Sequence, residues 1–205
     1  MKRSKSSKDW LHEHFTDTYV KQAKAEGYRS RAVYKLIAIQ EKYKIIKPGM
    51  TVLDIGAAPG GWSQLATEWV GDKGKVIAVD LLPITSLARV TLIQGDITDE
   101  NIWQQIQQEI VPRGEVDVIL SDMAPNISGI TVSDQARTIG LIENVIEIAD
   151  QILSPKGVLL TKIFQGAGFD EILKHLRQTY KKVQIVKPPA SRQRSRELYL
   201  LAWKS

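Results

Sequence analysis

Residues 51–62 read Thr-Val-Leu-Asp-Ile-Gly-Ala-Ala-Pro-Gly-Gly-Trp, and this stretch decides the fold. It opens with a short apolar run typical of a buried strand and continues through a glycine-rich turn into a helical pattern. Glycines at a turn from strand to helix let the backbone approach a ligand that side chains would keep away. Ligands of open parallel sheets bind beyond the carboxyl ends of the strands, so the residues that follow each strand are the informative ones.

Strands and helices alternate along the rest of the chain. Apolar runs rich in β-branched residues predict strands at Thr51–Asp54, Val76–Val79, Thr91–Ile93, Val116–Leu120 and Val158–Thr161. Helical spacing of apolar residues predicts helices at Ser30–Tyr43, Trp62–Val70, Asp99–Ile110, Ser133–Leu153 and Phe169–Tyr180. Two last strand-like runs, Val183–Val186 and Leu198–Trp203, have no helix between them. We expect a Rossmann-like α/β fold: a mostly parallel seven-stranded sheet, an antiparallel C-terminal edge hairpin, and helices on both faces.

The length and composition of the chain indicate one domain and exclude several kinds of chemistry. The 205 residues contain no long linker or repeat, and we expect a single domain with a basic arm over residues 1–30 and a core over 31–205. No apolar run reaches the roughly 18 residues of a membrane span, and the charged start is not followed by the apolar segment of a secretory signal. We therefore expect a cytoplasmic protein that does not contact a membrane. The absence of cysteine excludes disulfides and thiolate chemistry, and the three histidines lack metal-site spacing, so we expect no metal.

Charge is distributed unevenly along the chain. Residues 1–35 hold nine Lys/Arg against four Asp/Glu, and residues 174–205 hold nine against one, whereas residues 36–173 carry a net charge of −8. Two basic ends around an acidic middle are expected when the ends meet a polyanion such as RNA. Solvated lysine-rich termini would give the same pattern without a partner.

Four predicted strands lead to acids at the same edge of the sheet. These are Asp54, Asp80, Asp96 and Asp122. Asp is common in turns and at helix caps, which could explain any one of the four but explains the repetition poorly. Asp54 could hold a ligand ammonium or order the loop, Asp80 could accept ribose hydroxyls, and Asp96 could accept an adenine amino group.

The glycine-rich loop does not match a dinucleotide-binding loop. It lacks the G-x-G-x-x-G spacing, and Pro59 removes an amide that could face a phosphate. Such a loop suits a nucleoside with an amino-acid tail better than a diphosphate. S-adenosylmethionine fits, because its sulfonium and ammonium charges suit an acidic pocket, and Gly56 and Gly60 are the glycines that would let it approach.

The residues after the later strands favour a hydroxyl as the methyl acceptor. Without cysteine the covalent route to pyrimidine carbons is closed, and residues 122–125 contain no aromatic side chain to stack a flipped base. A hydroxyl of high pKa benefits from a base. Lys162 follows the fifth predicted strand, where burial and a neighbouring positive charge such as Lys35 would favour its neutral amine. Glu197 is the one acid in the last 32 residues. Taken alone, Glu197 is typical of a surface salt bridge, and Lys35 of a solvated helix lysine.

Five stretches together resemble the FtsJ-type ribosomal RNA 2′-O-methyltransferases over essentially the whole chain. They are Arg29–Leu36, Asp54–Trp62, Ser121–Asn126, Lys162–Gly166 and Ser195–Glu197. The resemblance implies a catalytic set of Lys35, Asp122, Lys162 and Glu197, with Lys162 as the usual proposed base. It also implies S-adenosylmethionine contacts at Gly60, Trp62, Asp80, Asp96 and Asp122, which Asp54 and Gly56 of the loop complete. In bacterial members the substrate is a uridine ribose of 23S rRNA in the assembled large subunit, while related members act on transfer RNA or messenger RNA caps.

These expectations describe a monomer that uses S-adenosylmethionine to methylate ribosomal RNA. We expect RNA phosphates to contact Arg29, Arg31, Arg192, Arg194 and Arg196, because arginine suits bidentate phosphate binding. Other classes stay open. A protein or small-molecule methyltransferase would keep the loop and the acids without needing basic ends, whereas an RNA-binding assembly factor would keep the charge without needing Lys162. The loop disfavours a nucleotide-dependent oxidoreductase.

Overall fold

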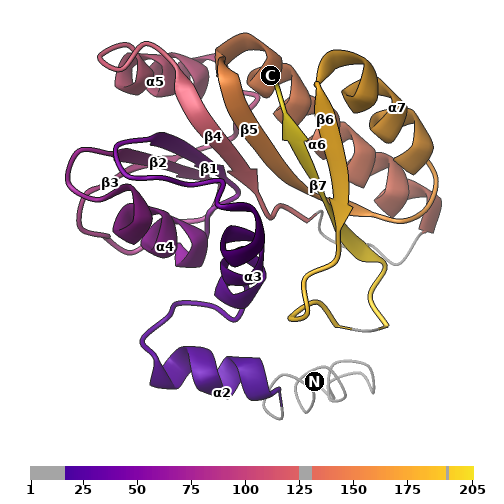
Figure 1. Cartoon of the computed structure of the whole chain (residues 1–205), viewed down its shortest axis with the longest axis horizontal. Helices are drawn as coiled ribbons and strands as arrows, with labels where there is room; N and C mark the ends of the chain where they lie inside the picture. Colours follow the sequence, from indigo (N-terminus) through magenta and orange to yellow (C-terminus); the bar gives the residue numbers. More distant parts are fainter. Residues whose placement is uncertain (1–16, 125–130, 193) are drawn as a thin grey trace, which may run out of the picture.

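The computed structural model of the chain describes residues 17–124, 131–192 and 194–205, with only the backbone of residues 131–134. The strands are β1 (Thr51–Ile55), β2 (Lys75–Asp80), β3 (Val90–Gln94), β4 (Val116–Ser121), β5 (Leu153–Phe164), β6 (Lys182–Val186) and β7 (Glu197–Trp203). They form a seven-stranded sheet in the order β3-β2-β1-β4-β5-β7-β6 (Figure 1). The pairs among β1–β5 are parallel, and β7 is antiparallel to both β5 and β6. The predicted mostly parallel sheet with an antiparallel C-terminal hairpin at its edge is confirmed.

Helices cover both faces of the sheet, as the sequence predicts. They are α2 (Thr18–Ala25), α3 (Val33–Tyr43), α4 (Gly61–Val70), α5 (Glu100–Ile110), α6 (Thr131–Ile152) and α7 (Phe169–Thr179). One apolar cluster joins α3 and α4 to one face, and a second joins α5, α6 and α7 to the other. Figure 1 shows α3 and α4 away from the pair formed by α6 and α7, with α2 at the lower end of the molecule. No helix in the described part of the chain is long and apolar enough to cross a membrane.

Helix α2 was not predicted, because it lacks the apolar stripe on which sequence patterns depend. Of its eight residues only Ala23 is buried. The helix begins after Asp17, whose carboxylate accepts a hydrogen bond from the amide of Tyr19, which is a standard helix cap. This helix lies within the predicted basic arm, whose residues 1–16 lie outside the described ranges.

Strand β5 is longer than predicted, and this corrects the position of Lys162. We expected the strand to end at Thr161, with Lys162 after it, but β5 continues to Phe164. Antiparallel pairing with β7 extends it, because Lys162 lies opposite Tyr199 and Phe164 opposite Glu197. Glu197 likewise begins β7 instead of preceding it. Both charged side chains are thus held by a regular ladder.

Candidate active site

The pleat of the sheet places several charged residues on one face at one edge. Side chains at alternate strand positions point to the same face. On one face of the sheet, the alternate positions are apolar and pack under α3 and α4. At the strand ends the same alternation leads to charged residues on this face: Asp54, Asp80, Asp122 and Lys162. The register aligns them, because Asp54 lies beside Leu120 and Leu120 beside Leu160, two positions before Asp122 and Lys162. The predicted gathering of polar groups at the carboxyl edge is found for these strands.

Four side chains from four elements form a continuous chain of contacts, which we call the charged cluster: Lys35 of α3, Asp122 after β4, Lys162 of β5 and Glu197 of β7. Lys162 Nζ lies 3.0 Å from Asp122 Oδ1 and also donates to the Asp122 carbonyl oxygen. Lys35 Nζ lies 3.8 Å from the same Oδ1 and 2.8 Å from Glu197 Oε1. The structure therefore brings together the four residues that the resemblance implied.

Tyr199 completes this cluster, and the sequence analysis missed it. Its hydroxyl donates to Asp122 Oδ1 at 2.5 Å, and its ring lies 5.8 Å from the ring of Trp62 and 5.7 Å from Lys35 Nζ. The side chain is fully buried. The signal was its position two residues after Glu197, on the same face of β7, but the strand reads as a plain apolar run.

The ionisation of the cluster follows from its charges. Burial alone would raise the pKa of Asp122, but Lys162 and Lys35 together with the Tyr199 hydrogen bond outweigh it and leave that pKa below its usual value. Burial first, and then the charges of Asp122 and Glu197, raise the pKa of Tyr199 well above its usual value. The cluster therefore contains an anionic Asp122 and a neutral Tyr199 over the physiological range.

On the β1 side of the edge lie two carboxylates that form no salt bridge with a Lys or Arg of the described residues. Asp54 is 1% exposed and accepts a hydrogen bond of 2.6 Å from Ser63 Oγ of α4. Burial raises its pKa to about 7; the Ser63 hydrogen bond opposes this shift, while the charges of Asp122 and Asp80 add to it. Asp80 accepts one amide bond on each oxygen, from Ala58 and from Leu82, both at 2.8 Å. Both carboxylates therefore order the glycine-rich loop and its surroundings.

Two glycines of the loop have backbone conformations that other residues rarely adopt. Gly56 has φ +75°, and a Cβ there would lie 2.1 Å from Met123 Cγ. Gly60, with φ +102°, directly precedes α4, and a Cβ there would lie 3.0 Å from Leu87. The peptide bond between Ala58 and Pro59 is cis. The loop keeps its backbone close to the strand ends because no Cβ intervenes at these two positions.

The other two predicted cofactor residues differ in their surroundings. Trp62 is 3% exposed, and its indole N–H donates to the Ala32 carbonyl at 2.8 Å, so it connects the loop to the start of α3. Asp96 is exposed and accepts from the amide and hydroxyl of Thr98 through Oδ1. These two hydrogen bonds lower the pKa of Asp96. Asp96 thus has the turn-capping role that was the alternative interpretation, and its contact with a cofactor stays a prediction.

This edge of the sheet can accommodate S-adenosylmethionine. Asp54 and Asp80 form no salt bridge to Lys or Arg within the described residues, and burial together with repulsion from Asp122 and Asp80 opposes the charge of Asp54. A sulfonium and an ammonium group would relieve that repulsion. Within residues 17–124, 131–192 and 194–205, no group of three His, Asp or Glu side chains could hold a metal ion.

Of the five arginines predicted to contact RNA, at least three form contacts within the protein: Arg29, Arg31 and Arg192. Arg29 donates to the carbonyl oxygens of Pro59, Thr85 and Ser86. Arg31 pairs with Asp17 at 2.8 Å and donates to the Ala190 carbonyl at 2.5 Å. Three of the five lie in the connection between β6 and β7: Arg192 is half-buried, whereas Arg194 and Arg196 are exposed. Phosphate contact by all five stays a prediction.

Comparisons with known proteins give one consistent family. Residues 28–205 match the FtsJ-like methyltransferase family. Proteins named ribosomal RNA large subunit methyltransferase E, from Legionella pneumophila and Pseudomonas aeruginosa, are 52% identical over 202 residues, which cover 98% of this chain and 97–98% of each relative. A solved ribosomal RNA methyltransferase structure from Plasmodium falciparum is 29% identical with a TM-score of 0.76 and covers 86% of this chain and 98% of that one.

Proposed function

Because the chain belongs to the FtsJ-like methyltransferase family, we propose that it methylates the 2′-hydroxyl of a uridine ribose in 23S rRNA of the large ribosomal subunit. Methyltransferases of such families generally use S-adenosylmethionine, and the curated relatives are named for the large-subunit RNA. The proposal includes a single-domain monomer of residues 1–205 that works in the cytoplasm without a metal and has a basic arm over residues 1–30.

The observation that carries this proposal is the contact chain from Lys162 through Asp122 and Lys35 to Glu197. It lies on the sheet face that also presents the carboxylates suited to a sulfonium donor. The side chains of Lys162, Lys35 and Glu197 are only 7%, 12% and 12% exposed, so their mutual geometry is fixed. A cluster of this kind can orient one hydroxyl and handle one proton.

In the proposed mechanism, bound S-adenosylmethionine supplies a methyl group on a positively charged sulfur. Asp54, Asp80 and Asp96, together with the loop from Gly56 to Trp62, would hold it. Lys162 Nζ, as the neutral amine, would orient the ribose 2′-hydroxyl and accept its proton as the methyl group is transferred to the hydroxyl oxygen. Asp122 holds the Lys162 amine in place through the 3.0 Å contact. Lys35, held by Glu197, lies 3.8 Å from Asp122 Oδ1 and helps to hold that carboxylate in place.

The experiment uses large ribosomal subunits from a bacterium that lacks its own enzyme of this kind. We would incubate them with the protein and S-adenosylmethionine labelled in the methyl group, then map ribose methylation along 23S rRNA. We expect one methylated uridine with the wild type, a rate lower by about 10²–10⁴-fold with Lys162→Ala, and full activity with Lys174→Ala, an exposed lysine of α7.

Other outcomes of this experiment identify the alternatives. Methylation of transfer RNA or capped messenger RNA, with none in 23S rRNA, would transfer the proposal to those substrates. Binding of the subunits without any methyl transfer would favour an assembly factor. Unchanged turnover by Lys162→Ala would reject Lys162 as the base.

A further inference from the structure

A pocket of about 380 Å³ lies between the start of α2 and the β6–β7 connection. Its lining residues are Asp17, Thr18, Tyr19, Arg31, Pro189, Ala190, Ser191 and Arg192. The volume falls within the roughly 300–1,000 Å³ of small-ligand sites. None of the comparisons assigns it a role.

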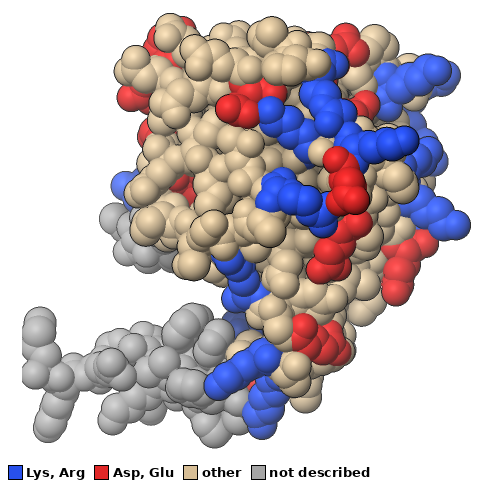
Figure 2. Space-filling view, turned by 90° about the vertical axis from the view of Figure 1, so that its left-hand side faces the viewer, with Lys and Arg blue, Asp and Glu red and all other residues tan. Residues whose placement is uncertain are grey.

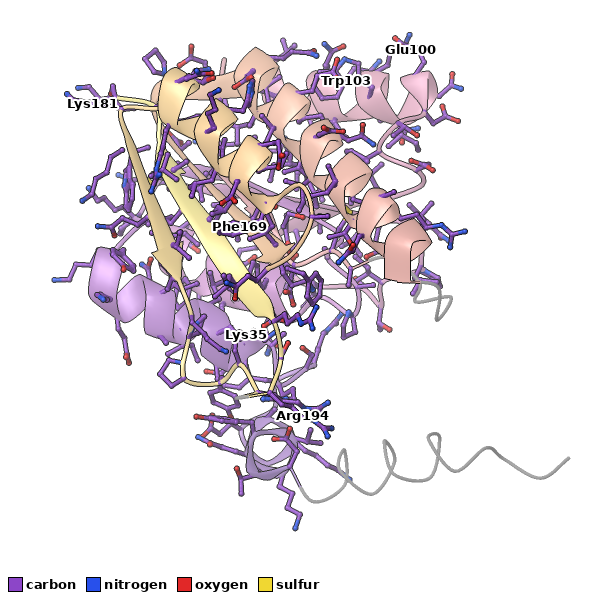
Figure 3. The ribbon with its side chains drawn as sticks, turned by 90° about the vertical axis from the view of Figure 1, so that its right-hand side faces the viewer. Lys35, Glu100, Trp103, Phe169, Lys181 and Arg194 are labelled. Carbon is purple, nitrogen blue, oxygen red and sulfur yellow. The ribbon has the colours of Figure 1, made fainter. Side chains whose placement is uncertain are left out.

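One residue that lines this pocket also contacts the charged cluster. Ser191, which lines the pocket, donates to Glu197 Oε1 at 2.9 Å. Arg31 lies one helical turn before Lys35. Figure 3 shows Lys35 and Arg194 toward the lower end of the molecule, with Lys181 at the opposite end. A ligand in this pocket would therefore lie beside Glu197, at one end of the charged cluster.

Two arginines from distant parts of the chain face one carboxylate in this pocket. Asp17 Oδ2 lies 2.8 Å from Arg31 Nη1 and 3.8 Å from Arg192 Nη2. Among the described residues, two guanidinium groups thus lie against this one carboxylate. Phosphate oxygens suit such a pair at least as well as a carboxylate does, because arginine binds both in the same planar geometry.

An aromatic ring completes the lining. The Tyr19 ring is partly exposed, lies 5.6 Å from the Arg31 guanidinium carbon, and packs against Tyr34 with centroids 5.2 Å apart. Tyrosine rings held in this way stack on unpaired RNA bases. On the face of the molecule that Figure 2 draws, basic side chains lie among acidic ones.

We propose that this pocket binds a nucleotide next to the methylated ribose, with Tyr19 against its base and Arg31 and Arg192 on its phosphate. Asp17 occupies the phosphate position when RNA is absent and is displaced when RNA binds. This inference rests on the proposed function, in which the substrate is RNA.

The test depends on three variants whose effects have different signs. We would measure binding of fluorescein-labelled octauridylate by anisotropy between 50 and 200 mM KCl, and the KM for unmethylated large subunits. Asp17→Asn keeps the helix cap but removes the competing charge, so binding should tighten about threefold or more. Arg192→Ala should weaken binding and lower the log–log salt slope by about one. Tyr19→Ala should weaken binding at least about fivefold.

Lys181→Ala is the matched control, because Lys181 is exposed and lies at the opposite end of the sheet. The inference is overturned if Asp17→Asn fails to tighten binding, if Arg192→Ala and Tyr19→Ala behave like the control, or if octauridylate does not bind at 50 mM KCl. Methylation of 23S rRNA is scored separately. If it occurs while these variants have no effect, only the pocket assignment fails; if the variants behave as expected without any methylation, only the proposed function fails.

Discussion

Asp54 and Asp122 lie on the same sheet face at the ends of the neighbouring strands β1 and β4, yet the protein shifts their pKa values in opposite directions. The pKa of Asp54 is raised to about 7, because burial and two nearby carboxylates oppose its charge. The pKa of Asp122 is lowered, because Lys162 and Lys35 outweigh the effect of burial. The direction in which the pKa of a strand-end carboxylate shifts therefore depends on whether cations lie beside it. Among the described residues no Lys or Arg forms a salt bridge with Asp54 or Asp80, so the β1 side suits a cationic donor, whereas the carboxylate on the β4 side is paired with lysines and suits proton transfer.

The largest expected effect comes from removing the charge that balances the β4 side. Asp122→Asn leaves the buried Lys35 and Lys162 without the carboxylate between them. We expect methyl transfer to fall by about 10²–10⁴-fold and the free energy of unfolding to fall by about 3–5 kcal/mol. Urea unfolding and single-turnover methylation measure the two quantities. Asp117→Asn is the matched control on the same strand. A stable, active Asp122→Asn protein would contradict the claim that the β4 side depends on a carboxylate paired with lysines.

A smaller effect is expected at Glu197, which contacts Asp122 only through Lys35. Glu197→Gln keeps the shape and leaves Lys35 held by Asp122 alone. We expect a loss in kcat of roughly 10²-fold or less, because Lys35, Asp122 and Lys162 all remain and only their relative positions change. The dissociation constant for S-adenosylmethionine should not change. If that constant rose while kcat stayed constant, Glu197 would belong to the cofactor side instead.

The pH dependence of stability should distinguish the two carboxylates. The raised pKa of Asp54 contributes stability that is complete below its usual pKa of 3.8 and is lost as pH rises through about 7. The lowered pKa of Asp122 has the opposite sign, since its contribution is present above 3.8 and is lost as pH falls.

Asp54→Asn should therefore flatten the decline in unfolding free energy between about pH 4 and pH 7, by at most about 1.4 kcal/mol per pH unit. Urea unfolding at several pH values measures this slope. Equal slopes in the variant and the wild type would contradict the raised pKa.

Much of the fold was predictable from the sequence because apolar periodicity reports burial. β1, β4 and α5 lie within one or two residues of their predicted bounds. Helix α2 was not predictable, because only one of its residues is buried and the helix therefore shows no apolar stripe. The length of β5 depends on its partner β7, which no local pattern contains.

For the site, the strand-end acids marked the edge of the sheet, but their partners could not be predicted from spacing. Tyr199 was missed because its hydroxyl meets Asp122 only after β7 has paired with β5. The internal hydrogen bonds of Arg29 were missed for the same reason, since its carbonyl partners are distant in the sequence. The sequence thus indicated which residues lie at this edge of the sheet, but it did not predict the contacts between distant segments.

The most direct test of this account is the proton balance of S-adenosylmethionine binding at pH 6.5, measured by calorimetry in buffers of different ionisation enthalpy. A cation beside Asp54 favours the ionised carboxylate, so we predict that binding releases a large fraction of one proton from the wild type and much less from Asp54→Asn. Binding without proton release, or equal release by both proteins, would contradict the claim that the carboxylates on the β1 side of the sheet bind a cationic ligand.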